Sequence, residues 1–179
     1  MQTQPLKLFA RGQTASLLLA AAIAATIPVP ASALEVTRSR VVAAPPAAVW
    51  SLIGGFCDIQ RWHPQVTRCT LSSETGAPVR ALVAAGGLGT LIEIETARDE
   101  AARRYSYRLV SGPLPVKDYA ATLSVTPAGE GPDKDSSKGA TVTWTARFEA
   151  EGMTEAEAVA DIVGVYEAGL AGIAREAAP

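Results

Sequence analysis

Apolar residues recur at helical spacing near the end of the chain, in the segment 154–176. They fall on one face of a helix over about five turns: Val159, Ile162, Val163, Tyr166, Leu170 and Ile173. Thr154, followed three residues later by Glu157, fits the capping box that starts many helices. The pattern therefore predicts one long amphipathic helix as the last element.

Seven other segments carry the two-residue alternation, or the β-branched and aromatic residues, that are typical of strands. They cover residues 34–44, 66–74, 79–85, 90–97, 103–111, 118–126 and 140–150. Turn signals such as Thr75-Gly76 and Gly112-Pro113 separate them. Consecutive strands with short connections predict an antiparallel meander, and the terminal helix makes the fold class α+β.

The alternation within three of the strands indicates which side chains face the helix. These inward sets are Tyr105, Tyr107 and Leu109, then Tyr119, Ala121, Leu123 and Val125, then Val142, Trp144, Ala146 and Phe148. Small alanines between large rings leave room on this face. We therefore expect either a close-packed core or a cavity between sheet and helix.

A short helical region with aromatic residues joins the first two strands. Residues 49–56, VWSLIGGF, place four apolar side chains on one helical face, and Pro45 and Pro46 suit its first turn. A second short segment then presents Trp62 and His63, the only histidine of the chain. Aromatic side chains aimed at one place indicate one wall of a cavity.

Taken together, these features resemble the START-like, helix-grip (SRPBCC) superfamily, in particular its polyketide cyclase/dehydrase-like proteins and the plant abscisic acid receptors. The receptors' VWSLV..F helix is similar to residues 49–56, and a receptor cysteine has the spacing that Cys69 has after Phe56. The resemblance covers residues 34–174. It implies a helix-grip fold, in which a curved antiparallel sheet of about seven strands surrounds the C-terminal helix in the order β-α-α-β-β-β-β-β-β-α. A ligand cavity would lie between sheet and helix.

The resemblance also assigns roles to two loops. Residues 86–89, GGLG, lie where the receptors carry a gate loop, and residues 111–115, SGPLP, lie where they carry a latch loop. On glycine content alone, both segments also read as ordinary hairpin turns. Leu114 and Pro115 replace a polar, basic pair of the receptors, which argues against a hormone-receptor role.

His63 and Glu93 are the candidate catalytic or anchoring groups. By the resemblance, His63 falls on the position of a ligand-contacting lysine and Glu93 on that of a pocket glutamate. A histidine can act as general acid or base near neutral pH, but a lone histidine is commonly held by a backbone carbonyl. In residues 90–96, TLIEIET, simple alternation would bury the isoleucines and expose Glu93, so alternation and resemblance disagree.

The residues expected around the ligand combine these assignments with the inward-facing aromatic side chains, because aromatic walls suit a flat or hydrophobic ligand. They are Trp62, His63, Leu88, Glu93, Tyr107, Leu114, Tyr119, Trp144 and Tyr166. The expected partner is a small hydrophobic molecule.

Composition narrows the classes of partner. Among 179 residues, 16 are Lys or Arg and 18 are Asp or Glu, without a long basic run. A mildly acidic chain of this kind is a poor nucleic-acid binder. One histidine and two cysteines do not make a metal-ligand set, and the sequence carries neither a phosphate-binding glycine loop nor a nucleophile signature. We therefore expect no cofactor and no metal.

Residues 1–33 read as an export signal. Lys7 and Arg11 precede the apolar run 15–27, and the small residues that end the segment fit a cleavage site. The run is short for a membrane span, which needs about 20 apolar residues, so an uncleaved anchor is the alternative. We expect a START-like ligand-binding domain, residues 34–179, that is periplasmic or secreted, with no stable membrane insertion after cleavage.

Cys57 and Cys69 both remain after cleavage. Export would place them where disulfides persist, and at twelve residues apart they could bridge. Geometry decides this pairing, so two small buried hydrophobic side chains are the alternative.

Three functions stay open at this point. The first is an exported protein that binds a small hydrophobic molecule in an internal cavity. The second is a polyketide cyclase/dehydratase-like enzyme in which His63, Glu93 and Tyr119 move protons. The third is a periplasmic accessory protein that acts on a protein partner. Fold similarity alone does not choose among them.

Overall fold

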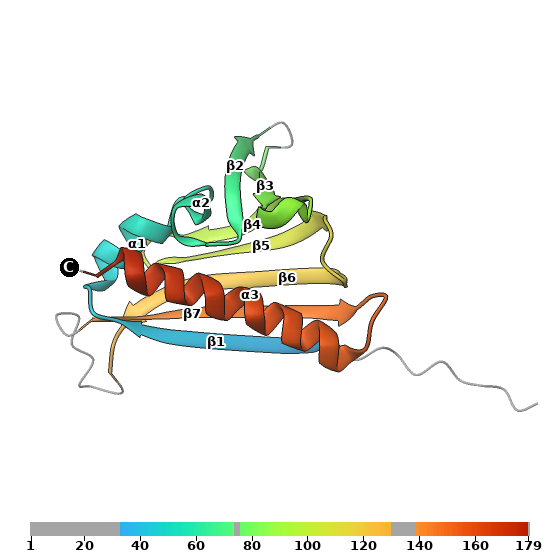
Figure 1. Cartoon of the computed structure of the whole chain (residues 1–179). Helices are drawn as coiled ribbons and strands as arrows, with labels where there is room; N and C mark the ends of the chain where they lie inside the picture. Colours follow the sequence, from blue (N-terminus) through green and yellow to red (C-terminus); the bar gives the residue numbers. More distant parts are fainter. Residues whose placement is uncertain (1–32, 74–75, 130–138, 179) are drawn as a thin grey trace, which may run out of the picture. The chain divides into compact units, whose positions relative to one another are not determined.

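The computed structural model describes residues 33–73, 76–129 and 139–178 (Figure 1). All of them belong to one unit, Ala31–Pro179. The predicted export signal, residues 1–33, lies outside the described residues except for Ala33. Within the described residues, no helix has both the length and the apolar character that a membrane span requires.

In the described residues, seven strands form one antiparallel sheet in the spatial order β1-β7-β6-β5-β4-β3-β2 (Figure 1). Each strand from β2 to β6 pairs with the next one along the chain, and β1 pairs with β7. The strands are β1 (Leu34–Val42), β2 (Val66–Ser72), β3 (Val79–Ala84), β4 (Thr90–Asp99), β5 (Arg104–Ser111), β6 (Val116–Pro127) and β7 (Ala140–Ala150). The predicted meander and the α+β class are confirmed.

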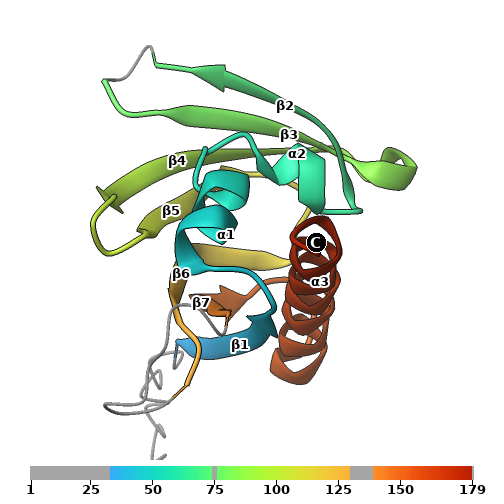
Figure 2. The ribbon, with the colours of Figure 1, turned by 90° about the vertical axis from the view of Figure 1, so that its left-hand side faces the viewer.

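The helices lie on one side of this sheet. Helices α1 (Pro46–Ile53) and α2 (Ile59–Trp62) connect β1 to β2, the short 3-10 turn η1 (Ala85–Gly87) joins β3 to β4, and α3 (Glu155–Glu176) follows β7. The sheet curves around α3, and α1 and α2 lie beside its C-terminal end (Figure 2). This is the helix-grip order that the resemblance implied.

Helix α3 starts and packs as its sequence predicts. The Thr154 side chain accepts a hydrogen bond from the Glu157 backbone N–H, and the Glu157 side chain accepts one from the Thr154 N–H. The apolar stripe is buried at Ile162, Tyr166, Leu170 and Ile173. Because burial of one such side chain contributes about 1.5–3 kcal/mol, packing against the sheet stabilises the helix more than helix propensity does.

The inward faces of β5, β6 and β7 are also those that the alternation predicts. Leu109 is half-buried and the other members of the three sets are buried: Tyr105, Tyr107, Tyr119, Ala121, Leu123, Val125, Val142, Trp144, Ala146 and Phe148. Together with the stripe of α3 and the apolar face of α1, these side chains form the core.

Strand β6 begins two residues before the expected strand 118–126. Val116 already pairs with Ala150, and a register shift before Ala120 leaves Asp118 in the left-handed region with φ 52°. Such a bulge interrupts the alternation from which strands are predicted, so the start of β6 could not be predicted from the sequence. The other strand ends lie within two residues of their expected positions.

Cys57, which precedes α2, forms a disulfide with Cys69 on β2, and their Cα atoms are 5.5 Å apart. The backbone N–H of Cys69 also donates to the side-chain oxygen of Gln60 on α2, at 2.9 Å. Both contacts fasten α2 to the edge strand of the sheet. They hold in place the segment that carries Trp62 and His63.

Candidate functional site

A cavity of about 500 Å³ lies between α3, the inner face of the sheet and two loops. This volume falls within the range of roughly 300–1,000 Å³ that small-molecule sites occupy. Its apolar walls include Ile59, Val66, Leu82, Leu91, Ile162 and Val165. The polar or partly polar side chains in its walls are His63, Gln65, Glu93, Tyr107, Tyr119, Trp144 and Asp161.

Seven of the nine residues predicted around a ligand line this cavity: His63, Leu88, Glu93, Tyr107, Leu114, Tyr119 and Trp144. Trp62 and Tyr166 do not line it and are buried in the core. The ring of Trp144 stacks on that of Tyr166 with centroids 4.3 Å apart and lies 5.7 Å from that of Trp62. The structure therefore places these two side chains behind the wall, where they support Trp144.

The two loops predicted as gate and latch meet at the cavity. Leu88, which follows η1, and residues 113–115 all contribute to its lining. A Cβ on Gly89 would lie 3.5 Å from the ring of Pro113, so the loops are in near contact. Leu88 is 70% exposed, so a large apolar side chain is exposed to solvent at the rim of the cavity.

His63 borders the cavity, but both of its ring nitrogens are bonded to the backbone. Nδ1 accepts from the N–H of Gln65 and Nε2 faces the carbonyl oxygen of Val165, each at 3.1 Å. Because a backbone N–H can only donate, we assign the proton to Nε2. Burial lowers the pKa of His63 to about 4, although the bond to Val165 partly opposes this shift. The ring is therefore neutral at physiological pH and has no nitrogen free for a ligand.

Two glycines on α3 let the helix approach this wall. A Cβ at Gly169 would lie 2.7 Å from both the His63 ring and the Trp144 ring. A Cβ at Gly172 would overlap the carbonyl oxygen of Trp62. Only glycine fits at these positions without movement of the wall, so the sequence of α3 fixes how closely it meets α2.

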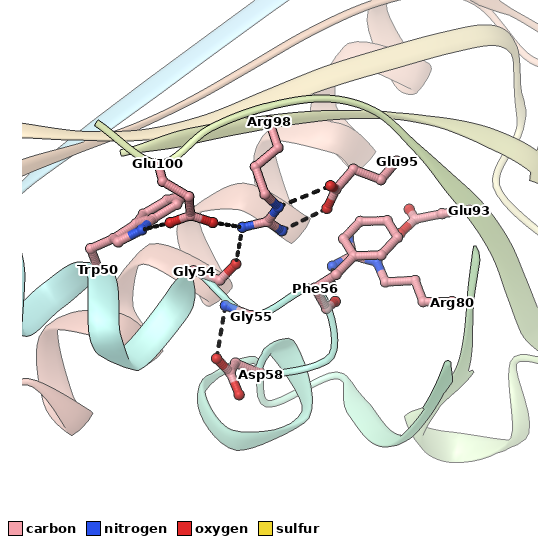
Figure 3. A network of polar contacts seen from close by, with 10 residues as sticks. All are labelled: Trp50, Gly54, Gly55, Phe56, Asp58, Arg80, Glu93, Glu95, Arg98 and Glu100. Atoms are coloured by element: carbon pink, nitrogen blue, oxygen red, sulfur yellow. Dashed lines mark hydrogen bonds and ion pairs between the residues drawn. The ribbon is translucent and has the colours of Figure 1, made fainter. Parts of the chain in front are cut away.

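Glu93 lies in the cavity wall with a buried counter-charge behind it. Glu93 is 4% exposed and Arg80 is fully buried. Arg80 donates from Nε to Glu93 Oε2 and from Nη1 to the carbonyl oxygen of Phe56, each at 2.6 Å. Its guanidinium lies 4.1 Å from the centre of the Phe56 ring and 4.7 Å from that of Tyr107. Figure 3 shows the Phe56 ring beside Arg80 and Glu93. The ion pair and the rings offset the cost of burying both charges.

A second ion pair on β4, between Arg98 and Glu95, is not part of the cavity lining. Figure 3 shows this pair and its neighbours. Arg98 donates to both carboxylate oxygens of Glu95, at 2.9 and 2.6 Å, and to the carbonyl oxygen of Gly54 at 2.8 Å. Arg98 also donates to Glu100, which accepts from the indole N–H of Trp50 at 2.7 Å. This network holds α1 against the end of β4, and we assign it a structural role.

Strand β4 reverses the simple alternation that its sequence suggests. Its two glutamates are buried and its isoleucines are half-buried, because two arginines supply the counter-charges. Sequence reasoning missed Arg80 as the partner of Glu93. A signal was present, since Arg80 alternates with Leu82 on the inward face of β3 and a charge on a buried face needs a partner.

Aromatic hydroxyl groups supply the remaining hydrogen-bonding groups of the wall. The Trp144 indole N–H donates to the Tyr107 hydroxyl oxygen at 2.9 Å, and the Tyr119 and Tyr166 hydroxyls share a hydrogen bond at 2.6 Å. Burial raises the pKa of Tyr107 and of Tyr119 well above the usual range, so both hydroxyls stay protonated. Tyr107, Tyr119 and Glu93 all line the cavity.

These groups suit recognition better than proton transfer. The His63 ring is neutral, and both of its nitrogens are hydrogen-bonded to the backbone. The Glu93 carboxylate is ion-paired with Arg80. The tyrosine hydroxyls are too weakly acidic to titrate near neutral pH. In the part of the chain that the structure describes, no three His, Cys, Asp or Glu side chains are grouped so that they could hold a metal ion.

Several solved structures are similar to this chain over most of its length. Protein XoxI from Bacillus cereus is 30% identical, with 80% of this chain and 94% of that chain covered and a TM-score of 0.71. A protein from Thermobifida fusca is 36% identical, with 78% and 90% covered and a TM-score of 0.63. An aromatase/cyclase from a Streptomyces species is 20% identical, with 82% and 94% covered and a TM-score of 0.63, which shows a shared fold. No curated protein matches the sequence.

The sequence also matches a protein family across residues 33–178, which spans all the strands and helices described above. The match agrees with the helix-grip order and with the resemblance noted in residues 49–69. The chain belongs to the polyketide cyclase / dehydrase and lipid transport family.

Proposed function

We propose that the protein binds one small hydrophobic molecule in the cavity between α3 and the sheet. The observation that carries the proposal is the cavity itself, about 500 Å³ with mainly apolar walls. A hollow of this size with mainly apolar walls is typical of small-molecule sites. The description of the family, which includes lipid transport, supports a role with apolar molecules.

A cyclase or dehydratase is the alternative within this family. The likeness to an aromatase/cyclase supports it only at the level of the fold, since the identity is 20%. The proton-transfer groups that such an enzyme would need are occupied, because His63 has no free nitrogen and Glu93 is ion-paired. Binding without turnover therefore accounts better for these residues.

We also propose that the domain acts outside the cytoplasm, in the periplasm or after secretion. The charged start, apolar run and small-residue end of residues 1–33 support export. The bridge between Cys57 and Cys69 is compatible with it, because disulfides persist in oxidising compartments.

A titration with the neutral fluorescent probe N-phenyl-1-naphthylamine tests the binding proposal. Ala84 lines the cavity, whereas the adjacent Val83 is 38% exposed and does not line it. Ala84→Phe should fill part of the cavity and weaken probe binding about tenfold or more. Val83→Phe adds the same ring outside the cavity and should bind the probe as the wild type does.

The comparison of Ala84→Phe with Val83→Phe can also contradict the binding proposal. Unchanged affinity in Ala84→Phe, with saturable binding in the wild type, would place the probe elsewhere on the protein. The absence of saturable binding to the wild type would remove the support for a ligand cavity.

A further inference from the structure

One part of the cavity wall comes from the short segment between α1 and β2, residues 54–65, which we call the α2 segment. Ile59, His63 and Gln65 of this segment line the cavity. Helix α2 spans only four residues, and the Asp58 side chain before it accepts from the Gly55 N–H instead of capping the helix. Isolated helices shorter than about 12–15 residues are marginal in water. The position of this wall therefore depends on contacts with the rest of the fold.

The α2 segment is fastened at its start and at its end to different elements. At its start, the disulfide joins Cys57 to Cys69 on β2, and the Cys69 N–H donates to the Gln60 side chain at 2.9 Å. At its end, His63 Nε2 donates to the carbonyl oxygen of Val165 on α3 at 3.1 Å. The disulfide is thus a covalent tie between the wall and the edge of the sheet.

Reduction of the bridge would leave the start of the segment with noncovalent ties. Ile59 follows Cys57 by two residues, so its place in the cavity wall depends directly on that attachment. A ligand would then have to order the segment as it binds. The apparent dissociation constant rises in inverse proportion to the fraction of molecules whose wall is already formed. The state of the bridge should therefore change the affinity of the cavity.

The chemistry of the bridge allows it to open and close. Cys57 and Cys69 are both half-buried, so neither lies fully enclosed in the core. A small or protein disulfide closes the bridge by exchange: it takes two electrons and two protons from the two thiols and becomes two thiols itself. A dithiol reopens the bridge by the reverse exchange.

We propose that the bridge between Cys57 and Cys69 is a redox switch, with which the cavity holds a ligand tightly when the bridge is closed and weakly when both thiols are free. The proposal rests on the proposed function, because it concerns the affinity of the same cavity. Thiols stay reduced in the cytoplasm and disulfides persist outside it. An exported protein of this kind reaches its tight-binding state only after export.

A titration with N-phenyl-1-naphthylamine tests the switch on the oxidised protein and on the same protein treated with dithiothreitol. Reduction should raise the dissociation constant about fivefold or more, which is the lower end of typical couplings. Treatment with glutathione disulfide should restore the original value. The double variant Cys57→Ser with Cys69→Ser is the matched control: it should bind as weakly as the reduced wild type, with or without dithiothreitol.

Hydrogen exchange tells a local opening from a general loss of structure. In the reduced protein, amide exchange should become faster in residues 57–69 on the time scale of the titration. The strands β5 to β7 and helix α3 should stay protected on that time scale, since they do not depend on the bridge for their pairing and packing. Circular dichroism should show that the reduced protein is still folded at the temperature of the assay.

Equal dissociation constants for the oxidised and the reduced protein would overturn this inference and leave the proposed function standing. Unfolding of the whole domain on reduction would overturn it as well, because the bridge would then support the entire fold rather than one wall. If the oxidised protein shows no saturable binding, the proposed function fails and this inference fails with it.

Discussion

Protonation of His63 should destabilise the folded protein, and this is the sharpest consequence of the wall geometry. In the folded state, Nδ1 accepts from the Gln65 N–H and Nε2 donates to the Val165 carbonyl. A second ring proton would sit on Nδ1 and face a backbone N–H, so the cation would lose a bond and gain a repulsion. The nearby Arg80 charge also opposes the cation.

The magnitude follows from the difference in pKa between the folded and unfolded chains. The pKa of His63 is lowered from 6.5 to about 4 by burial. The unfolded chain therefore binds more protons between these values, and stability is lost as the pH falls from about 6.5 to about 4. At about pH 4.5 the loss from this one group is on the order of 2–3 kcal/mol. Above about pH 6.5 the contribution is fully present.

Urea unfolding of the wild type and of His63→Gln, at about pH 7.5 and about pH 4.5, isolates this contribution. Carboxylates titrate in the same interval, but they are shared by both proteins and cancel in the comparison. The wild type should lose about 2–3 kcal/mol more than the variant between the two conditions. NMR titration of the ring protons gives the pKa directly, because the chain has a single histidine.

A His63 ring that titrates at or above about pH 6.5 in the folded protein would contradict the predicted lowering of its pKa. Equal pH dependence in wild type and variant would do the same. Either result would mean that His63 is less constrained than its two backbone bonds indicate, and the acid–base alternative would regain support.

Three further predictions concern the helix contact, the bridge and export. Gly172→Ala should lower the free energy of unfolding by about 2–3 kcal/mol, because the new Cβ would overlap the backbone of α2. Gly164→Ala on the same helix has open space around the Cβ and should raise the free energy of unfolding by about 0.5–1 kcal/mol. Thermal unfolding that ranks the two variants the other way would contradict this prediction. Cys57 and Cys69 should resist alkylation in the unfolded, unreduced protein, and the bridge should contribute about 2–3 kcal/mol to stability; two freely alkylated thiols would exclude the bridge. The intact mass of the exported protein should correspond to a chain that starts at Leu34, and a membrane-bound species that keeps the first 33 residues would favour an anchor instead.

Most of the fold could be predicted because apolar periodicity reports burial directly. The stripe of α3 and the inward sets of β5 to β7 are buried as the sequence indicates. Periodicity fails where a face is buried but charged, as in β4, because alternation of apolar and polar residues does not show that Glu93 pairs with Arg80 on the neighbouring strand and Glu95 with Arg98 on its own strand. It also fails at Asp118, where a bulge interrupts the pattern.

The site was predictable only in part, for a related reason. Seven of the nine expected residues border the cavity. Tyr107, Tyr119 and Trp144 are inward aromatic side chains of the sheet, and the other four were assigned by the family resemblance. Sequence does not distinguish a ring that faces the cavity from one that packs behind it, and Trp62 and Tyr166 belong to the second kind. A His63 held by a backbone carbonyl was one of the two alternatives from the sequence, but the sequence did not show which carbonyl it is, because the contact with Val165 depends on how closely Gly169 lets α3 approach.

Native mass spectrometry of the protein purified from its own host tests whether the cavity holds a small molecule. We predict a one-to-one adduct of a small hydrophobic molecule that organic solvent releases. The adduct should be present in the wild type and in Val83→Phe and depleted in Ala84→Phe. An adduct that persists equally in Ala84→Phe would contradict binding in the cavity. A stoichiometric protein partner in place of a small molecule would favour the accessory-protein alternative.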